Sequence, residues 1–295
     1  MSIPAAPDAA ETEPLPSSIA SGLLRGAVLC AVLLSLGYGV FVWTDLGHQL
    51  DANAYFGRDL ALHRVIQFDH RILGAVSKGT LALMIAIVFV VGLIRRTPMV
   101  GLIAAVGIAV AVVGAEILKH ILPWKPMVAL DADYTAGLLH DSYPSGHTAI
   151  ATSVSLAMVI VLPARWRPWL AVAAGVVSAS YATGVVFAGW HRPSDAIGGI
   201  LWTGTCLSLA AWIAVWMRGH SVADPADNSG RGPLLGSIVA AVAVLLIALV
   251  GALVGSGSYP DADASFIIMV TLIVVATFTL TAWYGRRLHS VDWRS

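Results

Sequence analysis

The stretch between residues 119 and 195 decides the fold, because three short polar motifs interrupt a very apolar sequence there. They are KHILPWKP at 119–126, YPSGH at 143–147 and GWHRPSD at 189–195. Each motif stands at the end of an apolar run long enough to form a membrane-spanning helix. We therefore expect the histidines, lysines and aspartate of these motifs to meet at one membrane boundary.

The composition of the whole chain predicts an integral membrane protein. Of its 295 residues, 58% are hydrophobic and only 12% are charged, and the mean hydropathy is +0.81. A soluble domain carries about 25% charged residues. The formal net charge is zero, which argues against a nucleic-acid partner, since such a partner requires a basic patch. Cys30 and Cys206 both lie in apolar runs, so no disulfide framework is expected.

The apolar runs predict an all-α fold with eight membrane spans, each about 20 residues long. The predicted spans are 21–44, 74–94, 98–118, 145–163, 168–190, 195–217, 234–255 and 264–284. We interpret the first six as one core over residues 21–217 and the last two as additional helices within residues 234–295. A linker at 218–233, rich in Gly, Pro, Asp, Asn and Ser, separates the two groups.

Two further segments are polar. Residues 1–20 contain no Lys or Arg, unlike a cleavable signal peptide, and predict a disordered tail. Residues 45–73 mix charged and apolar residues, which is typical of a short helix lying along the membrane interface.

The distribution of basic residues predicts the orientation, because short cytoplasmic loops carry an excess of Lys and Arg. Ten of the 17 basic residues fall on one predicted side: Arg25, Arg95, Arg96, Arg165, Arg167, Arg218, Arg231, Arg286, Arg287 and Arg294. This bias places both termini in the cytoplasm. All three polar motifs and residues 45–73 then lie on the extracytoplasmic side.

The third motif carries a histidine and an aspartate four residues apart, His191 and Asp195, at a helix start marked by Pro193. An aspartate in the first turn can reach back to the residue before the helix, as in a capping box. A carboxylate beside one imidazole nitrogen fixes the tautomer and raises the basicity of the other nitrogen, which activates histidine as a nucleophile. Taken alone, the motif also fits an interfacial histidine followed by a capping aspartate.

The other two motifs offer anion-binding and proton-transfer groups. Ser145 and Gly146 open a helix whose free N–H groups and dipole favour an anion, and His147 can protonate a leaving oxygen. Lys119 and Lys125 add positive charge, which stabilises a phosphoryl group during transfer. Taken alone, these residues also fit an ordinary helix start and lysines at a membrane boundary.

An acidic residue and a group of aspartates lie near these motifs. Glu116 lies one turn before Lys119, and we expect the two to form an ion pair. Asp131, Asp133 and Asp141 are interpreted as solvated loop residues, and we predict no metal site.

The order of the three motifs resembles that of the type 2 phosphatidic acid phosphatase superfamily. The family pattern is Lys-x6-Arg-Pro, then Pro-Ser-Gly-His, then Ser-Arg-x5-His-x3-Asp, and the resemblance covers residues 21–217. The second motif matches in full at 144–147, and His-x3-Asp matches at 191–195. The first motif is one residue short, with Lys125 in place of arginine. In the third, Gly184 and Val185 replace Ser-Arg, and Arg192 is the candidate substitute.

The resemblance implies a membrane lipid phosphatase that needs no metal or other cofactor. In this interpretation His191 is the nucleophile, His147 is the general acid and base, and Asp195 orients His191. The phosphate-binding residues would be Lys119, Lys125, Ser145, Gly146 and Arg192. The partners would be the lipid bilayer and a lipid phosphate or diphosphate at the extracytoplasmic face of a bacterial cytoplasmic membrane. The substrate could be a polyprenyl phosphate, a phosphatidate-type lipid or an envelope glycolipid, and the sequence does not indicate the oligomeric state.

Two alternatives stay open at this stage. One is a lipid phosphotransferase, which passes the phosphoryl group to an acceptor other than water. The other is a protein that kept the scaffold for lipid binding or transport and lost catalysis. The absence of the Ser-Arg pair supports the second alternative.

Overall fold

The computed structural model describes residues 16–60, 74, 78–123, 142–218, 221–222 and 260–293. Its helical elements are α1 (Pro16–Tyr38), η1 (Gly39–Trp43), α2 (Asp45–Phe56), η2 (Gly57–Leu60), α4 (Lys78–Ile94), α5 (Pro98–Ile121), α6 (Gly146–Val161), η3 (Ala164–Trp166), α7 (Arg167–Phe187), α8 (Pro193–Arg218) and α10 (Pro260–Leu288). Two short antiparallel strands, β1 (Ser221–Val222) and β2 (Val291–Asp292), pair Ser221 with Asp292.

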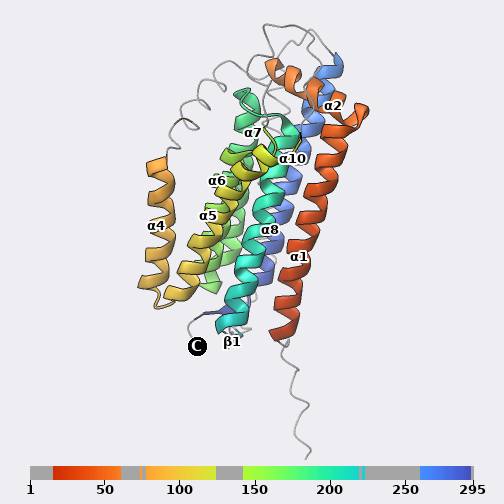
Figure 1. The fold of residues 1–295 in the computed structure, drawn as a ribbon. Helices are drawn as coiled ribbons and strands as arrows, with labels where there is room; N and C mark the ends of the chain where they lie inside the picture. Colours follow the sequence, from red (N-terminus) through yellow and green to blue (C-terminus); the bar gives the residue numbers. More distant parts are fainter. Residues whose placement is uncertain are drawn as a thin grey trace, which may run out of the picture.

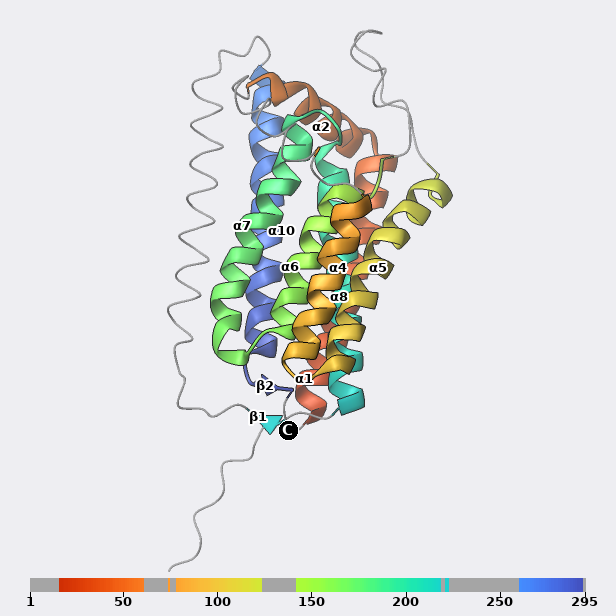
Figure 2. The same ribbon diagram turned by 90° about the vertical axis from the view of Figure 1, so that its left-hand side faces the viewer.

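The long helices lie side by side along one axis and form a bundle (Figure 1). Helix α8 is central, because it contacts α1, α5, α6, α7 and α10. Helix α2 lies across one end of the bundle, where α5 ends and α6 and α8 begin (Figure 2). We name this end the site end. The paired strands and the first turn of α1 lie at the opposite end (Figure 1).

The described helices support the integral membrane class by their length and composition. Five are long and apolar enough to cross a membrane: Ile19–Trp43, Pro98–Ile121, Ala164–Phe187, Pro193–Met217 and Ala262–Leu288. Helices α4 and α6, also predicted as spans, are apolar but shorter than 18 residues. The span predicted at 234–255 lies outside the described residues, so the count of six plus two helices stays a prediction.

The first helix begins earlier than the sequence analysis predicted. Helix α1 begins at Pro16, so the last five residues of the predicted 1–20 tail are helical. Proline is favoured in the first turn of a helix, which explains this start. At the other side of the chain, α10 packs against α7, α2 and α8, so this predicted additional helix is part of the same bundle.

Packing within the bundle follows the distribution of small and large apolar residues. A Cβ on Gly175 of α7 would lie 2.6 Å from the ring of Phe278, so the glycine lets α7 and α10 approach closely. The outward faces of α1 and α5 instead expose large apolar side chains such as Leu29 and Val113. Such exposure suits a bundle surrounded by lipid.

Helix α2 confirms a helix over residues 45–56 of the predicted segment, whereas its position along the membrane interface stays a prediction. The side chain of Thr44 caps it by accepting a hydrogen bond of 3.1 Å from the Gly47 N–H. One face is buried and carries His48, Asp51 and Tyr55, whereas Leu46 on the other side is 80% exposed. A carboxylate therefore lies on the inward face of α2, at the site end.

Candidate active site

The turn between α7 and α8 sets the position of the third motif. Gly189 has a φ of +70°, a left-handed conformation that favours glycine. The N–H groups of Gly189 and Trp190 donate to the carbonyls of Val186 and Val185, both at 2.9 Å, which forms a Schellman motif at the end of α7. The Tyr55 hydroxyl of α2 also donates to the Gly189 carbonyl. His191 follows directly and is held between the two helices.

Asp195 lies in the first turn of α8 and is fully buried. Its Oδ2 accepts a 2.9 Å hydrogen bond from the Arg192 N–H, which confirms the predicted capping contact. The same oxygen accepts a 2.5 Å bond from the Ser142 hydroxyl and lies 3.6 Å from Nδ1 of His191. The last distance is longer than a hydrogen bond. Catalytic contacts of this kind often shorten when the substrate binds.

The second motif begins α6 with Ser145 as its cap. Ser145 is fully buried, and its Oγ accepts a 3.3 Å hydrogen bond from the Thr148 N–H. Its own N–H donates to the Asp195 carbonyl at 2.8 Å, so a backbone bond joins the second and third motifs. The N–H groups of Gly146 and His147 lie in the first turn, where α-helix geometry provides no intrahelical acceptor. This turn is therefore suited to an anion.

The two predicted catalytic histidines lie next to each other. Their ring centroids are 6.2 Å apart, and the planes are inclined at 61°. The His147 ring also contacts Trp190, with centroids 5.1 Å apart. His191 is buried and His147 is half-buried. The pair comes from two helix starts that are 44 residues apart in the sequence, and the arrangement allows both imidazoles to act on one group.

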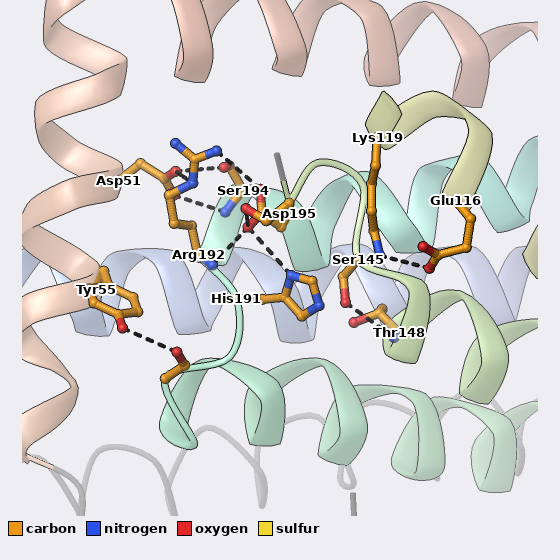
Figure 3. A network of polar contacts seen from close by, with 12 residues as sticks. Asp51, Tyr55, Glu116, Lys119, Ser145, Thr148, His191, Arg192, Ser194 and Asp195 are labelled. Carbon is orange, nitrogen blue, oxygen red and sulfur yellow. Dashed lines mark hydrogen bonds and ion pairs between the residues drawn. The ribbon is translucent and has the colours of Figure 1, made fainter. Parts of the chain in front are cut away.

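The first motif contributes Lys119 from the last turn of α5. Its Nζ pairs with Oε1 of Glu116 at 2.7 Å, as predicted. A Cβ on Gly146 would lie 2.5 Å from Glu116 Oε1 and 3.2 Å from Lys119 Nζ. A side chain at residue 146 would therefore displace the Glu116–Lys119 pair, which lies beside Ser145 at the start of α6 (Figure 3). Lys125 lies outside the described residues.

Arg192 is nearly buried, with 3% of its surface exposed. Its Nη2 lies 3.6 Å from Oδ1 of Asp195, and its Nε lies 3.8 Å from Oδ2 of Asp51. The guanidinium points away from the His191 ring and toward α2 (Figure 3). The structure thus pairs Arg192 with two carboxylates. Its predicted contact with a phosphate stays a proposal.

Sequence reasoning missed the contacts of Asp51 and Ser142 with the third motif. Asp51 is 1% exposed and accepts hydrogen bonds from the N–H and the hydroxyl of Ser194, at 2.9 and 2.6 Å. Burial raises the pKa of Asp51 to about 6, and the Arg192 charge opposes this rise. One signal was available: Asp51 shares a helix face with His48 and Tyr55 in a segment that mixes charged and apolar residues. Nothing in the pattern around Ser142 distinguishes it from other loop serines.

Comparison with known proteins supports the grouping of the three motifs in one site. Residues 98–220, which run from the start of α5 beyond the end of α8 and contain all three motifs, match the model of the PAP2 superfamily. No match to this chain was found among curated proteins or among solved structures. The superfamily match confirms the resemblance seen in the motifs. It supports a phosphatase that acts on phosphate esters.

Acidic, histidine and cysteine side chains are the usual protein ligands of metal ions. Within the ranges that the structure describes, no three of them are grouped so that they could hold a metal ion.

Proposed function

We propose that this protein hydrolyses a phosphate monoester or diphosphate on a lipid through a phosphohistidine. One observation carries the proposal: the ring of His191 lies 6.2 Å from that of His147 and has a buried aspartate behind its Nδ1. A histidine supported by a carboxylate is suited to nucleophilic attack, and a second histidine nearby is suited to proton transfer.

In the proposed mechanism, Nε2 of His191 attacks phosphorus and the bond to the leaving oxygen breaks. His147 donates a proton to that oxygen as it leaves. Water then attacks the phosphohistidine, His147 takes a proton from the water, and the bond between phosphorus and nitrogen breaks. Asp195 holds the His191 ring in place through Nδ1 throughout both steps.

The proposed phosphate-binding set surrounds the start of α6. Lys119, the Ser145 hydroxyl and the Gly146 N–H contact the phosphoryl oxygens, with Lys125 as a further cation. Arg192 contributes positive charge beside the nucleophile, and its action is the least direct because its guanidinium faces Asp51 and Asp195. Cations and N–H groups placed in this way stabilise the charge of the transition state.

We propose that the substrate is a lipid that enters sideways from the bilayer. The site lies at one end of a bundle whose outer faces are apolar, next to the interfacial helix α2 (Figure 1). The basic residues of the loops support an extracytoplasmic site with both termini in the cytoplasm. A polyprenyl phosphate, a phosphatidate-type lipid and an envelope glycolipid all carry the required phosphate beside an apolar chain.

The test is a phosphate-release screen of the purified protein over a panel of these lipids, comparing wild type with His191→Ala. We expect release from at least one lipid and its loss in the variant. Loss of acid–base assistance alone costs about 10²–10⁴-fold, and loss of the nucleophile should cost more. His289→Ala, at the opposite end of the bundle, is the matched histidine control. Release by His191→Ala at the wild-type rate would rule out the phosphohistidine.

The same screen separates the two alternatives. A phosphotransferase would move the phosphoryl group to an added lipid alcohol faster than to water. A non-catalytic binding or transport protein would bind the lipids and release no phosphate. The buried Val185, in the position of the family's arginine, is the observation that favours this last candidate.

A further inference from the structure

Three buried charged side chains lie behind the proposed nucleophile, and only two of them belong to the third motif. Asp51 is 1%, Arg192 is 3% and Asp195 is 0% exposed. Asp51 comes from α2 and lies 143 positions before Ser194 of the motif. The guanidinium lies between the two carboxylates (Figure 3). One cation is thus shared by two acids.

We propose that Asp51 is a positioning residue for His191, acting through the start of α8 and through Arg192. The inference rests on the proposed function, because it assigns a role in the same reaction. Asp51 does not belong to any of the three motifs.

The first route is mechanical. Asp51 accepts hydrogen bonds from both the N–H and the hydroxyl of Ser194, the residue next to Asp195. An anion at this position also interacts favourably with the dipole of α8. These contacts attach the first turn of α8 to the interfacial helix. The carboxylate of Asp195, one residue further on, is thereby held at its distance from His191.

The second route is electrostatic. Asp195 offers Oδ1 to Arg192 and Oδ2 to the Arg192 N–H, the Ser142 hydroxyl and His191. With Asp51 ionised, part of the Arg192 charge is balanced from the other side. Without the Asp51 charge, the guanidinium would pair with Asp195 alone and weaken the field of that carboxylate at His191. The histidine would then be a poorer nucleophile.

The burial of Asp51 is consistent with such a role. Taking an ionised carboxylate out of water is costly unless it is paired and hydrogen-bonded. The contacts described for the Asp51 carboxylate are all with Ser194 and Arg192. Burial raises its pKa to about 6 in spite of the arginine. Keeping this buried carboxylate ionised at neutral pH therefore costs free energy. Its described partners, Ser194 and Arg192, both belong to the third motif.

The test compares Asp51→Asn with wild type on whichever lipid the screen identifies. Asparagine keeps the shape and one acceptor and removes the charge. Partners that orient a metal-bound histidine are worth about 10–100-fold in activity, and we expect a fall of this size in kcat. KM should stay within about 2-fold, because Asp51 touches no substrate. Asp45→Asn, an exposed aspartate in the first turn of the same helix, is the matched control and should retain wild-type kcat.

A double-mutant cycle with Arg192→Gln sharpens the result. If Asp51 acts through Arg192, the fold-loss of kcat in the double variant should be smaller than the product of the two single fold-losses. Neutralising Arg192 removes the excess positive charge that Asp51→Asn leaves beside Asp195. Independent effects that simply multiply would overturn the electrostatic route.

Other outcomes are also decisive. A kcat within 2-fold of wild type for folded Asp51→Asn, with His191→Ala inactive, would overturn this inference and leave the proposed function intact. Phosphate release unaffected by His191→Ala would overturn both. If Asp51→Asn does not fold, Ser194→Ala replaces it, because it removes the 2.6 Å contact from the α8 side. A lower kcat at unchanged KM would then support the inference, and an unchanged kcat would overturn it.

Discussion

Two buried arginines, one at each end of the bundle, have guanidinium groups with different kinds of partner. Arg167, at the opposite end, is fully buried. Its Nε and Nη2 donate to the carbonyls of Val159 and Ile160, at 3.0 and 3.3 Å, and its Nη1 donates to those of Leu288 and Val291. Arg192, at the site end, instead faces two carboxylates at 3.6 and 3.8 Å.

The difference separates a charge held by backbone carbonyls from one held by carboxylates at the candidate site. The carbonyls around Arg167 belong to the last turns of α6 and α10 and to β2, so the arginine closes helix C-termini where a cation is favourable. Its partners carry no titratable group. Arg192 lies among acids, one of which contacts the proposed nucleophile. A change at Arg167 should therefore alter folding, and a change at Arg192 should alter the reaction.

The largest effect is expected from Arg167→Leu. The buried carbonyls of Val159, Leu288 and Val291 would lose the arginine as a donor, while that of Ile160 keeps the Trp293 indole N–H. Each unsatisfied buried group costs about 1–3 kcal/mol. We expect the detergent-solubilised variant to aggregate at a much lower temperature, or to accumulate poorly. The exposed Arg165, two residues earlier, provides the matched control Arg165→Leu, which should behave like wild type. Wild-type thermal stability of Arg167→Leu would contradict a structural role.

A smaller and different effect is expected from Arg192→Ala. Two buried carboxylates would lose their shared cation, and positive charge beside the phosphoryl group would be lost. We expect kcat/KM to fall by more than about 10-fold, equivalent to about 1.4 kcal/mol of transition-state stabilisation. Thermal stability should fall less than in Arg167→Leu. Steady-state kinetics on the identified lipid measure the first quantity, and unchanged kinetics would show that the site works without Arg192.

The smallest effect on the protein is expected from single cysteine substitutions that test which side of the membrane each end of the bundle faces. A cysteine at Gln49, exposed on α2, should react with a membrane-impermeant thiol reagent in intact cells. A cysteine at Arg165 should react only after the cells are opened. The native Cys30 and Cys206 are buried, so their background should be low. Neither substitution should change activity. The reverse labelling pattern would place the site in the cytoplasm.

Much of the fold was predictable because each apolar run forms its helix largely by itself. The runs around residues 98–121 and 193–217 predicted their helices to within a few residues. The boundary of α1 was less predictable, because a polar segment without Lys or Arg does not show where helical hydrogen bonding begins. Within the site, the contacts read from sequence were those of neighbours along a helix: Lys119 with Glu116, and Asp195 with the Arg192 N–H.

The sequence by itself determined the membrane class, the helix starts that carry the three motifs, and contacts between residues three or four positions apart. Helix geometry places such residues on one face, whatever the rest of the chain does. Only the tertiary structure decided where the long side chains end. The Asp51–Ser194 contact joins residues 143 positions apart. The same carboxylate lies 3.8 Å from Arg192, whose guanidinium points toward α2. The direction of a flexible, charged side chain depends on which opposite charge the packing of helices brings within reach, and no local pattern encodes that.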